Sequence, residues 1–199
     1  MIAVIDYGMG NLHSVQKALE FVGAKVFVTQ NADEIKQAQK LVLPGVGAMQ
    51  QAMERLNYLG LVDVIKEAVN QNKPFLGICL GLQLLFQESQ EGGQVKGLGI
   101  IPGSVKKLSN LKVPHIGWNQ IKKINPECPL FKDIPEGAFF YFCHSYYVEP
   151  KDLIWIATQT EYATNFASSI CGNNIFGVQF HPEKSHILGL KVLENFVRL

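Results

Sequence analysis

The sequence predicts a single α/β domain with a mixed, mostly parallel sheet flanked by helices. In the N-terminal half, short apolar runs alternate with amphipathic segments, which is the pattern of strands joined by helices. After Gly92-Gly93 the chain changes to short β-rich segments separated by glycine and proline. With 199 residues and no repeat, low-complexity tract or linker, the chain is expected to be one domain over residues 1–199.

The elements of the first half follow in order from these patterns. Residues 2–5 are a short apolar run that predicts a buried strand, and apolar residues recur at helical spacing over 12–22 before Gly23, which suits a helix end. The remaining expected elements are a strand at 26–28, a helix at 32–39, a strand at 41–43, one or two helices over 48–68 broken near 58–60, a strand at 75–78 and a helix at 80–87.

The second half is expected to consist of strands followed by one helix. The helix covers 185–197, where Leu188, Val192, Leu193 and Phe196 share one face. The expected strands lie at 97–104, 114–120, 139–148, 153–158, 167–171 and 175–180.

Composition excludes several classes of function. Lys plus Arg number 18 against 17 Asp plus Glu, and no basic block occurs, so neither nucleic acid nor a membrane surface is an expected partner. The longest apolar stretch, residues 75–86, is shorter than the roughly 20 residues that cross a bilayer, and no secretory signal is recognisable. The four cysteines lack CxxC spacing, so we expect reduced thiols, no metal, no cofactor and a cytoplasmic location.

The first candidate for chemistry is Cys79, in the segment Gly77-Ile78-Cys79-Leu80-Gly81. It lies between an expected strand and an expected helix, which is the thiol version of the nucleophile elbow. In such an elbow, flanking glycines let a strained turn project the central side chain. The dipole and free N–H groups at a helix start favour a thiolate there. The alternative is that Cys79 is only a small buried hydrophobic residue.

A thiolate nucleophile needs an imidazole partner, and His181 is the best placed of the five histidines. It directly follows an expected strand in the segment Phe-His-Pro-Glu. Pro182 fixes the backbone, and Glu183 returns to the same side of an extended segment as His181. The carboxylate can then bind one ring nitrogen while the other faces the thiol. A solvated His–Glu pair in a loop is the alternative.

A second turn from strand to helix carries Pro44-Gly45-Val46-Gly47. Glycines spaced in this way expose backbone N–H groups that can bind an anion or a developing oxyanion. A plain tight turn is the alternative. The dinucleotide fingerprint G-x-G-x-x-G is incomplete because position 50 is Gln, and no Gly-Lys-Ser/Thr follows for a phosphate loop.

Together these motifs resemble the class I, or triad, glutamine amidotransferases. The resemblance rests on residues 44–47, on residues 77–83 and on Gly-Val-Gln-Phe-His-Pro-Glu-Lys-Ser at 177–185. More narrowly, three further segments are similar to the glutaminase subunits of imidazole glycerol phosphate synthases in histidine biosynthesis. These segments are Asp-Tyr-Gly-Met-Gly-Asn at 6–11, Pro-His-Ile-Gly-Trp-Asn at 114–119 and Tyr-Phe-Cys-His-Ser-Tyr-Tyr at 141–147.

The resemblance implies a flavodoxin-like fold and the hydrolysis of glutamine to glutamate and ammonia. Cys79 would attack the side-chain amide, His181 would take and return the proton, and Glu183 would hold the imidazole. The resemblance also implies that backbone N–H groups of Leu80, Val46 and Gly47 meet the oxyanion and that Gly45, Gln83 and Ser145 bind the substrate. For Gln83 a polar position on an apolar helix face is the alternative, and for Ser145 a simple strand hydroxyl.

The family resemblance further implies a heterodimer. The ammonia would pass to a separate (β/α)8 barrel synthase, which makes imidazole glycerol phosphate and AICAR. The chain is too short to contain that barrel, which takes about 250 residues. Trp118, Tyr141 and Lys184 match positions at or near the subunit contact, with core packing as the alternative for the two aromatic residues and a solvated side chain for Lys184.

Glutaminases of this kind tend to be nearly idle alone, and the 44–47 loop offers a physical reason. Glycine tolerates positive φ, so a peptide beside it can rotate between presenting its carbonyl and its N–H. We therefore expect the Val46 N–H to point away from the oxyanion until the partner is loaded.

Three rival functions remain open at the level of sequence. One is a paralogous glutaminase subunit that supplies ammonia to a different synthase, such as a sugar-nucleotide amination enzyme. Another is a class I peptidase or deglycase with the same elbow, although Gln83 and the Pro-Glu after His181 favour glutamine. The third is a flavodoxin-like binding module in which Cys79 is only structural.

Overall fold

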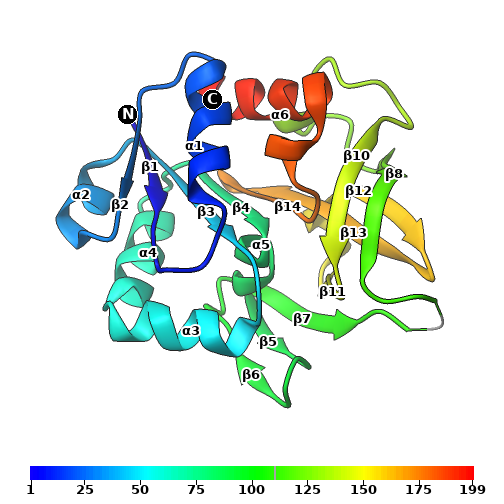
Figure 1. Ribbon diagram of the computed structural model, residues 1–199, viewed down its shortest axis with the longest axis horizontal. Coiled ribbons are helices and arrows are strands. Elements are labelled where there is room, and N and C mark those ends of the chain that lie inside the picture. The colour runs from blue at the N-terminus through cyan, green and yellow to red at the C-terminus, as the bar shows by residue number, and fades with distance from the viewer. Residues whose placement is uncertain (110) are drawn as a thin grey trace.

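The computed structural model describes residues 1–109 and 111–199, and its centre is a sheet of five parallel strands (Figure 1). In spatial order β2-β1-β3-β4-β14, these strands have the flavodoxin-like arrangement. Their bounds are Val26–Thr29 for β2, Ile2–Ile5 for β1, Lys40–Gly45 for β3, Phe75–Cys79 for β4 and Ile175–Val178 for β14. Strands β1, β4 and β14 are buried throughout, as expected of a parallel sheet covered on both faces.

Helices cover the two faces of the parallel sheet, and alternate strand residues point to each face. Ala3 and Ile5 belong to one hydrophobic core and Ile2 and Val4 to the other, as the period of two in a strand requires. The first core contains residues of α2 (Ala32–Gln37), α3 (Met49–Tyr58), α4 (Leu61–Asn70) and α5 (Leu80–Leu84). The second contains residues of α1 (Leu12–Phe21) and α6 (His186–Arg198).

The second half of the chain extends the sheet with mainly antiparallel strands. From β14 the order continues through β13 (Thr164–Gly172), β11 (Tyr146–Pro150), β7 (Ile101–Lys107), β5 (Phe86–Ser89) and β6 (Val95–Lys96). Strands β12 (Ile156–Tyr162) and β9 (Lys122–Lys123) branch from β13, while β8 (His115–Gln120) and β10 (Phe139–His144) form a separate antiparallel pair. Three 3-10 turns lie at Pro129–Phe131, Leu153–Trp155 and Pro182–Lys184.

Strand pairing brings the three predicted functional segments to one edge of the sheet. In the parallel register Gly45 of β3 lies beside Cys79 of β4, and Val178 of β14 lies beside Ile78 of β4. His181 follows β14 by only a few residues. The carboxyl ends of neighbouring parallel strands are where open α/β sheets bind ligands.

The fold confirms the predicted mixed α/β architecture and corrects several elements. The strand expected at 153–158 begins only at Ile156, because the Asp152 side chain accepts from the Ile154 N–H and starts a 3-10 turn. The strand expected at 97–104 begins only at Ile101, because the amides of residues 97–100 donate to carbonyls of residues 84–87. The helix expected at 80–87 ends at Leu84 and gives way to β5, because the Leu98 and Ile100 amides donate to the carbonyls of Leu84 and Leu85 and pull the chain into strand pairing. The strand expected at 139–148 breaks at Ser145 into β10 and β11, which belong to different sheets. The open choice over 48–68 resolves as two helices.

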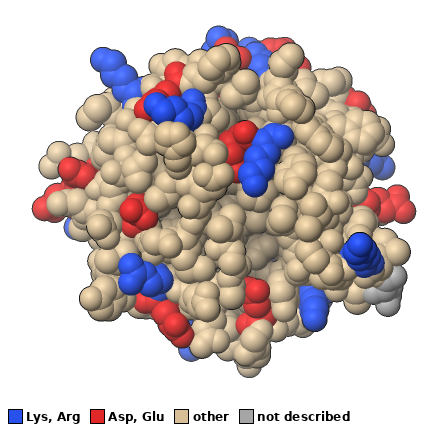
Figure 2. All heavy atoms as spheres, viewed as in Figure 1, with Lys and Arg blue, Asp and Glu red and all other residues tan. Residues whose placement is uncertain are grey.

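One face of the molecule shows charges of both signs close together. Figure 2 shows Lys and Arg side chains interspersed with Asp and Glu over the face in view, so this face gathers no extended field of one sign. Across residues 1–109 and 111–199, none of the helices combines the length and apolarity that a membrane crossing demands.

Replacing Gly81 by alanine is expected to destabilise the fold strongly. The added methyl group would lie 1.7 Å from the Leu43 carbonyl oxygen, and overpacking against backbone costs about 3 kcal/mol. Gly60→Ala is the control, because Gly60 has φ +66° but nothing within 4 Å of the added methyl group. It should cost only about 1 kcal/mol for the left-handed backbone. Urea unfolding measures both losses, and equal losses would contradict the close approach of α5 to β3.

Candidate active site

Cys79 occupies a strained turn between β4 and α5. Its backbone has φ 54° and ψ −107°, a positive φ that side chains with a Cβ adopt only at some cost in energy. The flanking glycines permit the turn, because a Cβ on Gly77 would lie 2.6 Å from the Gly81 carbonyl oxygen. The turn has the geometry that the elbow motif predicts, and it directs the thiol toward a cavity at the end of the sheet.

His181 and Glu183 form a buried pair after β14. The His181 Nδ1 lies 2.9 Å from Glu183 Oε1, and the two side chains are only 5% and 2% exposed. Pro182 begins a 3-10 turn that places the carboxylate beside the ring. The backbone of His181 is fixed as well, because its N–H donates to the Tyr141 carbonyl and its own carbonyl accepts from Ser185 Oγ. The ring is therefore held with Nε2 free to face Cys79.

Electrostatics favours a protonated imidazole at this position. Burial opposes charge on the ring, but hydrogen bonding and attraction from Cys79 and Glu183 outweigh it and raise the pKa of His181 to about 10. Cys79 and His181 line the same cavity, and the Glu183 carboxylate binds the ring at Nδ1. A cysteine, a histidine and an acid in this order can generate a nucleophile and shuttle its proton.

The thiol opens into a cavity of about 280 Å³. Its wall contains most of the residues that the sequence singled out, drawn from the ends of β3, β4, β10 and β14. The lining residues are Val46, Gly47, Cys79, Leu80, Gln83, Glu91, Pro114, Cys143, His144, Ser145, Tyr146, His181 and Lys184. The cavity is large enough for a small amino acid and small enough to enclose it.

The loop after β3 presents its backbone to this cavity. Gly47 has φ +100°, and Val46 is exposed although it is apolar. Gly45 sits behind the loop, where an added Cβ would lie 2.2 Å from the hydroxyl oxygen of Tyr7. Leu80 begins α5, so its N–H has no partner within the helix and is free for an anion.

The structure also shows functional candidates that the sequence analysis missed. Gln179 is fully buried and places its Nε2 3.6 Å from Cys79 Sγ. Its signal was the period of two, which puts residue 179 on the same side of the chain as His181. Tyr7 is buried beside Gly45. Burial is the main cause of the raised pKa of its hydroxyl, and the nearby Cys79 adds to it.

Gln83 reaches the cavity with its amide already oriented. Its Nε2 donates to the Tyr146 carbonyl at 2.9 Å and to Gln179 Oε1 at 3.0 Å, so both amide hydrogens are used and the amide oxygen is left for a ligand. Glu91, also missed, brings a carboxylate to the wall. Its Oε2 accepts from the Met49 N–H at 2.7 Å, which fixes it at the start of α3.

The three predicted interface residues form one cluster on the surface. Trp118 is 45% exposed, stacks on His186 at 5.0 Å and meets Tyr141 edge to face at 6.2 Å. The Lys184 Nζ lies 5.8 Å from the centre of the Tyr141 ring. The exposure of Trp118 argues against core packing. Lys184 also lines the cavity, so the cluster adjoins the site.

Apolar side chains continue this surface along the outward face of β8 and β10. In the register of the pair, Trp118 lies opposite Tyr141 and alternate residues face the same way. The large exposed residues there and at the start of α6 are Ile116, Phe139 and Ile187.

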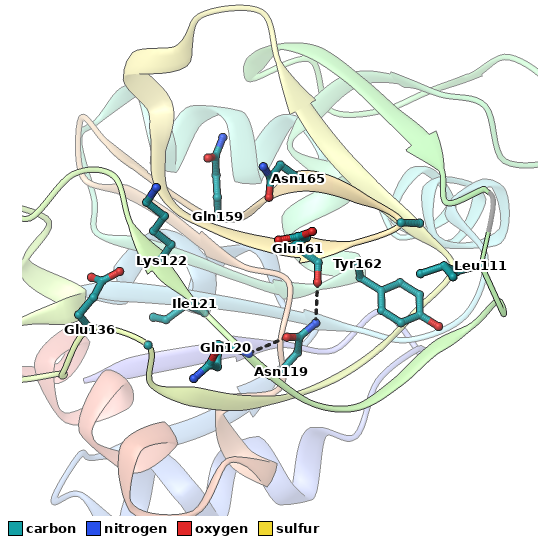
Figure 3. A pocket seen from close by; sticks show the side chains of 12 residues that line it. Leu111, Asn119, Gln120, Ile121, Lys122, Glu136, Gln159, Glu161, Tyr162 and Asn165 are labelled. Carbon is teal, nitrogen blue, oxygen red and sulfur yellow. Dashed lines mark hydrogen bonds between the residues drawn. The ribbon is translucent and has the colours of Figure 1, made fainter.

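A larger cavity, of about 650 Å³, lies elsewhere, between β8, β12 and β13 (Figure 3). Its lining residues contain neither cysteine nor histidine, so it lacks the chemistry of the smaller site. In the part of the chain that the structure describes, no three His, Cys, Asp or Glu side chains cluster closely enough to hold a metal ion.

The sequence and the fold match a known class of protein. Residues 3–199 fit the family model described as glutamine amidotransferase class-I, and the chain belongs to that family. Two solved structures share the fold at low identity: a glutamine amidotransferase (TM-score 0.78, 12% identical, 100% of both chains) and PurLQS from Thermotoga maritima (TM-score 0.76, 18% identical, 99% of this chain and 97% of that one).

Much more similar sequences carry one particular name, imidazole glycerol phosphate synthase subunit HisH. The protein of that name from Moorella thermoacetica is 55% identical over 199 residues, covering 100% of this chain and 94% of its own. Those from Pyrococcus furiosus and Methanocaldococcus jannaschii are 51% and 50% identical, again over 100% of this chain, and 98% and 100% of their own lengths.

The raised pKa of His181 predicts that Glu183 stabilises the protein in a pH-dependent way. A pKa that folding raises from about 6.5 to about 10 contributes stability fully below pH 6.5, and that contribution is lost as the pH rises toward 10. Glu183→Gln should lower the free energy of unfolding by about 2 kcal/mol at pH 6 and by much less at pH 10. Urea unfolding at both pH values measures this, with Glu127→Gln, an exposed site, as the control. A loss independent of pH would show that the charge of Glu183 does not act on His181.

Proposed function

We propose that the protein hydrolyses L-glutamine to glutamate and ammonia. The observation that carries this proposal is that Cys79 and His181 line one small cavity, with Glu183 hydrogen-bonded to the His181 ring, in a chain of the class I glutamine amidotransferase family. A cysteine nucleophile paired with a buried, oriented imidazole is suited to acyl transfer from an amide.

The reaction proceeds through a thioester. His181 takes the Cys79 proton, and the sulfur attacks the side-chain carbonyl carbon of glutamine, which becomes tetrahedral. His181 then gives the proton to the leaving nitrogen, so the C–N bond breaks and ammonia departs. Water, deprotonated by His181, attacks the thioester, the C–S bond breaks, and glutamate leaves with the enzyme restored. Glu183 keeps the ring oriented and stabilises its positive charge throughout.

The negative oxygen of each tetrahedral intermediate needs hydrogen-bond donors. Leu80, at the start of α5, and the loop residues Val46 and Gly47 line the same cavity as the thiol. Backbone N–H groups aimed at the developing oxyanion stabilise the transition state. We assign this role to the N–H groups of Leu80 and Gly47, and to that of Val46 once it has turned toward the oxyanion.

The cavity wall offers complementary groups to the amino-acid part of glutamine. The Glu91 carboxylate suits the α-ammonium group, and the Gln83 amide oxygen and the Ser145 hydroxyl are further polar contacts on the wall. Gly45 leaves no room for a side chain behind the loop, which keeps the backbone close to the substrate. No cofactor is needed for this hydrolysis.

The ammonia is passed to a synthase subunit in a heterodimer. The relatives that cover the full chain are named as subunits of imidazole glycerol phosphate synthase, which favours this reaction, in histidine biosynthesis, over supply to a sugar-nucleotide amination enzyme. The partner is a (β/α)8 barrel that makes imidazole glycerol phosphate and AICAR. It docks on the surface around Trp118, Tyr141 and Lys184, which adjoins the cavity. Direct transfer avoids protonation of ammonia in neutral solution.

Cys79→Ala is expected to lower glutamine hydrolysis by at least about 10³-fold, because the nucleophile is lost. Production of imidazole glycerol phosphate by the complex from added ammonium salt should continue, since the barrel is untouched. The measurements are glutamate release and synthase turnover, with glutamine or ammonium as nitrogen source. Cys171→Ala, a cysteine outside the cavity, is the matched control. Loss of both activities in Cys79→Ala would contradict the division of labour.

Glutamine turnover by this chain alone is expected to be low and to rise when the barrel synthase and its ligand are added, because the Val46 N–H then turns toward the oxyanion. Trp118→Ala should raise the synthase concentration needed for half-maximal activation by about 30-fold, the loss typical of one aromatic anchor. Tyr58→Ala, which removes an exposed aromatic residue from α3, serves as the control. Full turnover without a partner would rule out the rotation.

A further inference from the structure

Two buried histidines lie between β8 and β10, and the proposed chemistry does not use them. His115 and His144 face each other in the strand register, with exposed fractions of 3% and 5%. Their rings touch, with His115 Nδ1 2.9 Å from His144 Nε2. His115 is stacked between Phe142 at 5.0 Å and Tyr162 at 4.0 Å. Burial of two imidazoles in an aromatic cluster is costly unless all four ring nitrogens have hydrogen-bond partners.

The direction of every hydrogen bond in this pair is fixed by one carbonyl. The His144 Nδ1 lies 2.8 Å from the Tyr146 carbonyl oxygen, which can only accept, so His144 Nδ1 carries the proton. Its Nε2 must then accept, and the proton of that bond comes from His115 Nδ1. The His115 Nε2 accepts in turn from Asn119 Nδ2 at 3.3 Å. Both rings are therefore Nδ1–H tautomers, and all four ring nitrogens are satisfied.

The pair is suited to remain neutral. Burial lowers the pKa of His115 to about 4 and that of His144 to about 3, although the bond to the Tyr146 carbonyl acts in the opposite direction on His144. A neutral imidazole has one donor and one acceptor, which is what each position in the chain of hydrogen bonds requires.

At its inner end, this series of hydrogen bonds reaches the nucleophile Cys79. The Tyr146 carbonyl that accepts from His144 also accepts from Gln83 Nε2 at 2.9 Å. The same Gln83 amide group donates to Gln179 Oε1 at 3.0 Å, and Gln179 Nε2 lies 3.6 Å from Cys79 Sγ. The Tyr146 carbonyl is thus held from two sides, and a displacement of it would pass to Gln83 and Gln179 beside the sulfur.

At its outer end, the series of hydrogen bonds begins at Asn119 on β8. Its Nδ2 donates its second hydrogen to the Glu161 carbonyl at 3.0 Å, on the wall of the 650 Å³ cavity, as Figure 3 shows. Asn119 also follows Trp118 directly in the sequence. The series of hydrogen bonds therefore runs without a break from the half-buried Asn119 amide to the glutamine cavity.

We propose that His115 and His144 are positioning residues, fixed as Nδ1–H tautomers, that hold the Tyr146 carbonyl and through it Gln83 and Gln179 in place beside Cys79. The role in catalysis rests on the proposed glutaminase function. The tautomers do not, and so the two parts are tested separately.

The first test reads the tautomers directly. In the full chain labelled with 15N-histidine, NMR at pH 7 should show two neutral rings with the proton on Nδ1, the tautomer that free imidazole side chains populate less. His144→Phe should remove one of these signals and shift the other. Two rings with the proton on Nε2, or two charged rings, would overturn the proposal.

The second test separates positioning from stability. His144→Phe fills the space but donates nothing to Tyr146, and we expect a fall of about 10²-fold in kcat/KM for glutamine with a raised KM. A purely structural defect would lower apparent kcat through lost folded enzyme and leave KM unchanged. His144→Asn keeps an N–H near the position of Nδ1 and should restore part of the loss. If phenylalanine prevents folding at 144, His115→Phe, which keeps the aromatic stack, replaces it.

Thr158→Val is the matched control. It breaks another buried polar cluster, in which the Thr158 hydroxyl lies 2.8 Å from Ser168 Oγ, away from the cavity. Its KM should equal that of the wild type. If the wild type hydrolyses glutamine and the histidine variants have the same kcat and KM, the positioning role is overturned. A wild type inactive toward glutamine, with and without the synthase, would instead overturn the proposed function.

Discussion

The parallel pairing of β4 between β3 and β14 is the constraint on which the site depends. It brings Gly45 beside Cys79 and leads the chain from Val178 to His181 at the same edge. The segments that carry Gly45, Cys79 and His181 are far apart in the sequence, so the cavity forms only if the strands pair in this register. A slip of one residue would turn every strand side chain to the opposite face, exchanging the two cores as well as dismantling the site. The register that assigns alternate residues of Ile2–Ile5 to the two cores therefore also determines where the catalytic groups meet.

Close packing at the carboxyl ends of these strands then fixes the positions of the catalytic side chains. The backbone of α5 lies directly against β3, which only a glycine at 81 allows, and this approach turns Cys79 into a positive-φ conformation. On the other side, the β10 backbone holds His181 through the Tyr141 carbonyl. The strain at Cys79 and the buried charge at His181 each cost stability on their own. The charge on the ring is compensated by the Glu183 carboxylate, which lies 2.9 Å from Nδ1.

Local motifs in the sequence were sufficient to predict the elbow and the His–Glu pair, because each depends on spacing over a few residues. The alternation of apolar and amphipathic segments predicted a mixed α/β sheet, and its flavodoxin-like order followed from the family resemblance. The break at Ser145 was not predictable, since it depends on β10 leaving for a separate pair while β11 joins β7. The early end of α5 depends on distant amides at Leu98 and Ile100. The His115–His144 pair was missed for the same reason, because its role depends on the groups that face it across the fold and a linear pattern does not show them.

The order in which the chain leaves the ribosome gives the central position of β14 a further consequence. This strand lies in the middle of the sheet, yet it and His181 are made long after β4 and Cys79. The N-terminal strands and helices can begin to fold earlier, but the gap between β4 and β13 stays open until residues 175–178 have been made. A nascent chain that has not reached His181 would therefore carry the cysteine without its base. Such a chain would not hydrolyse glutamine.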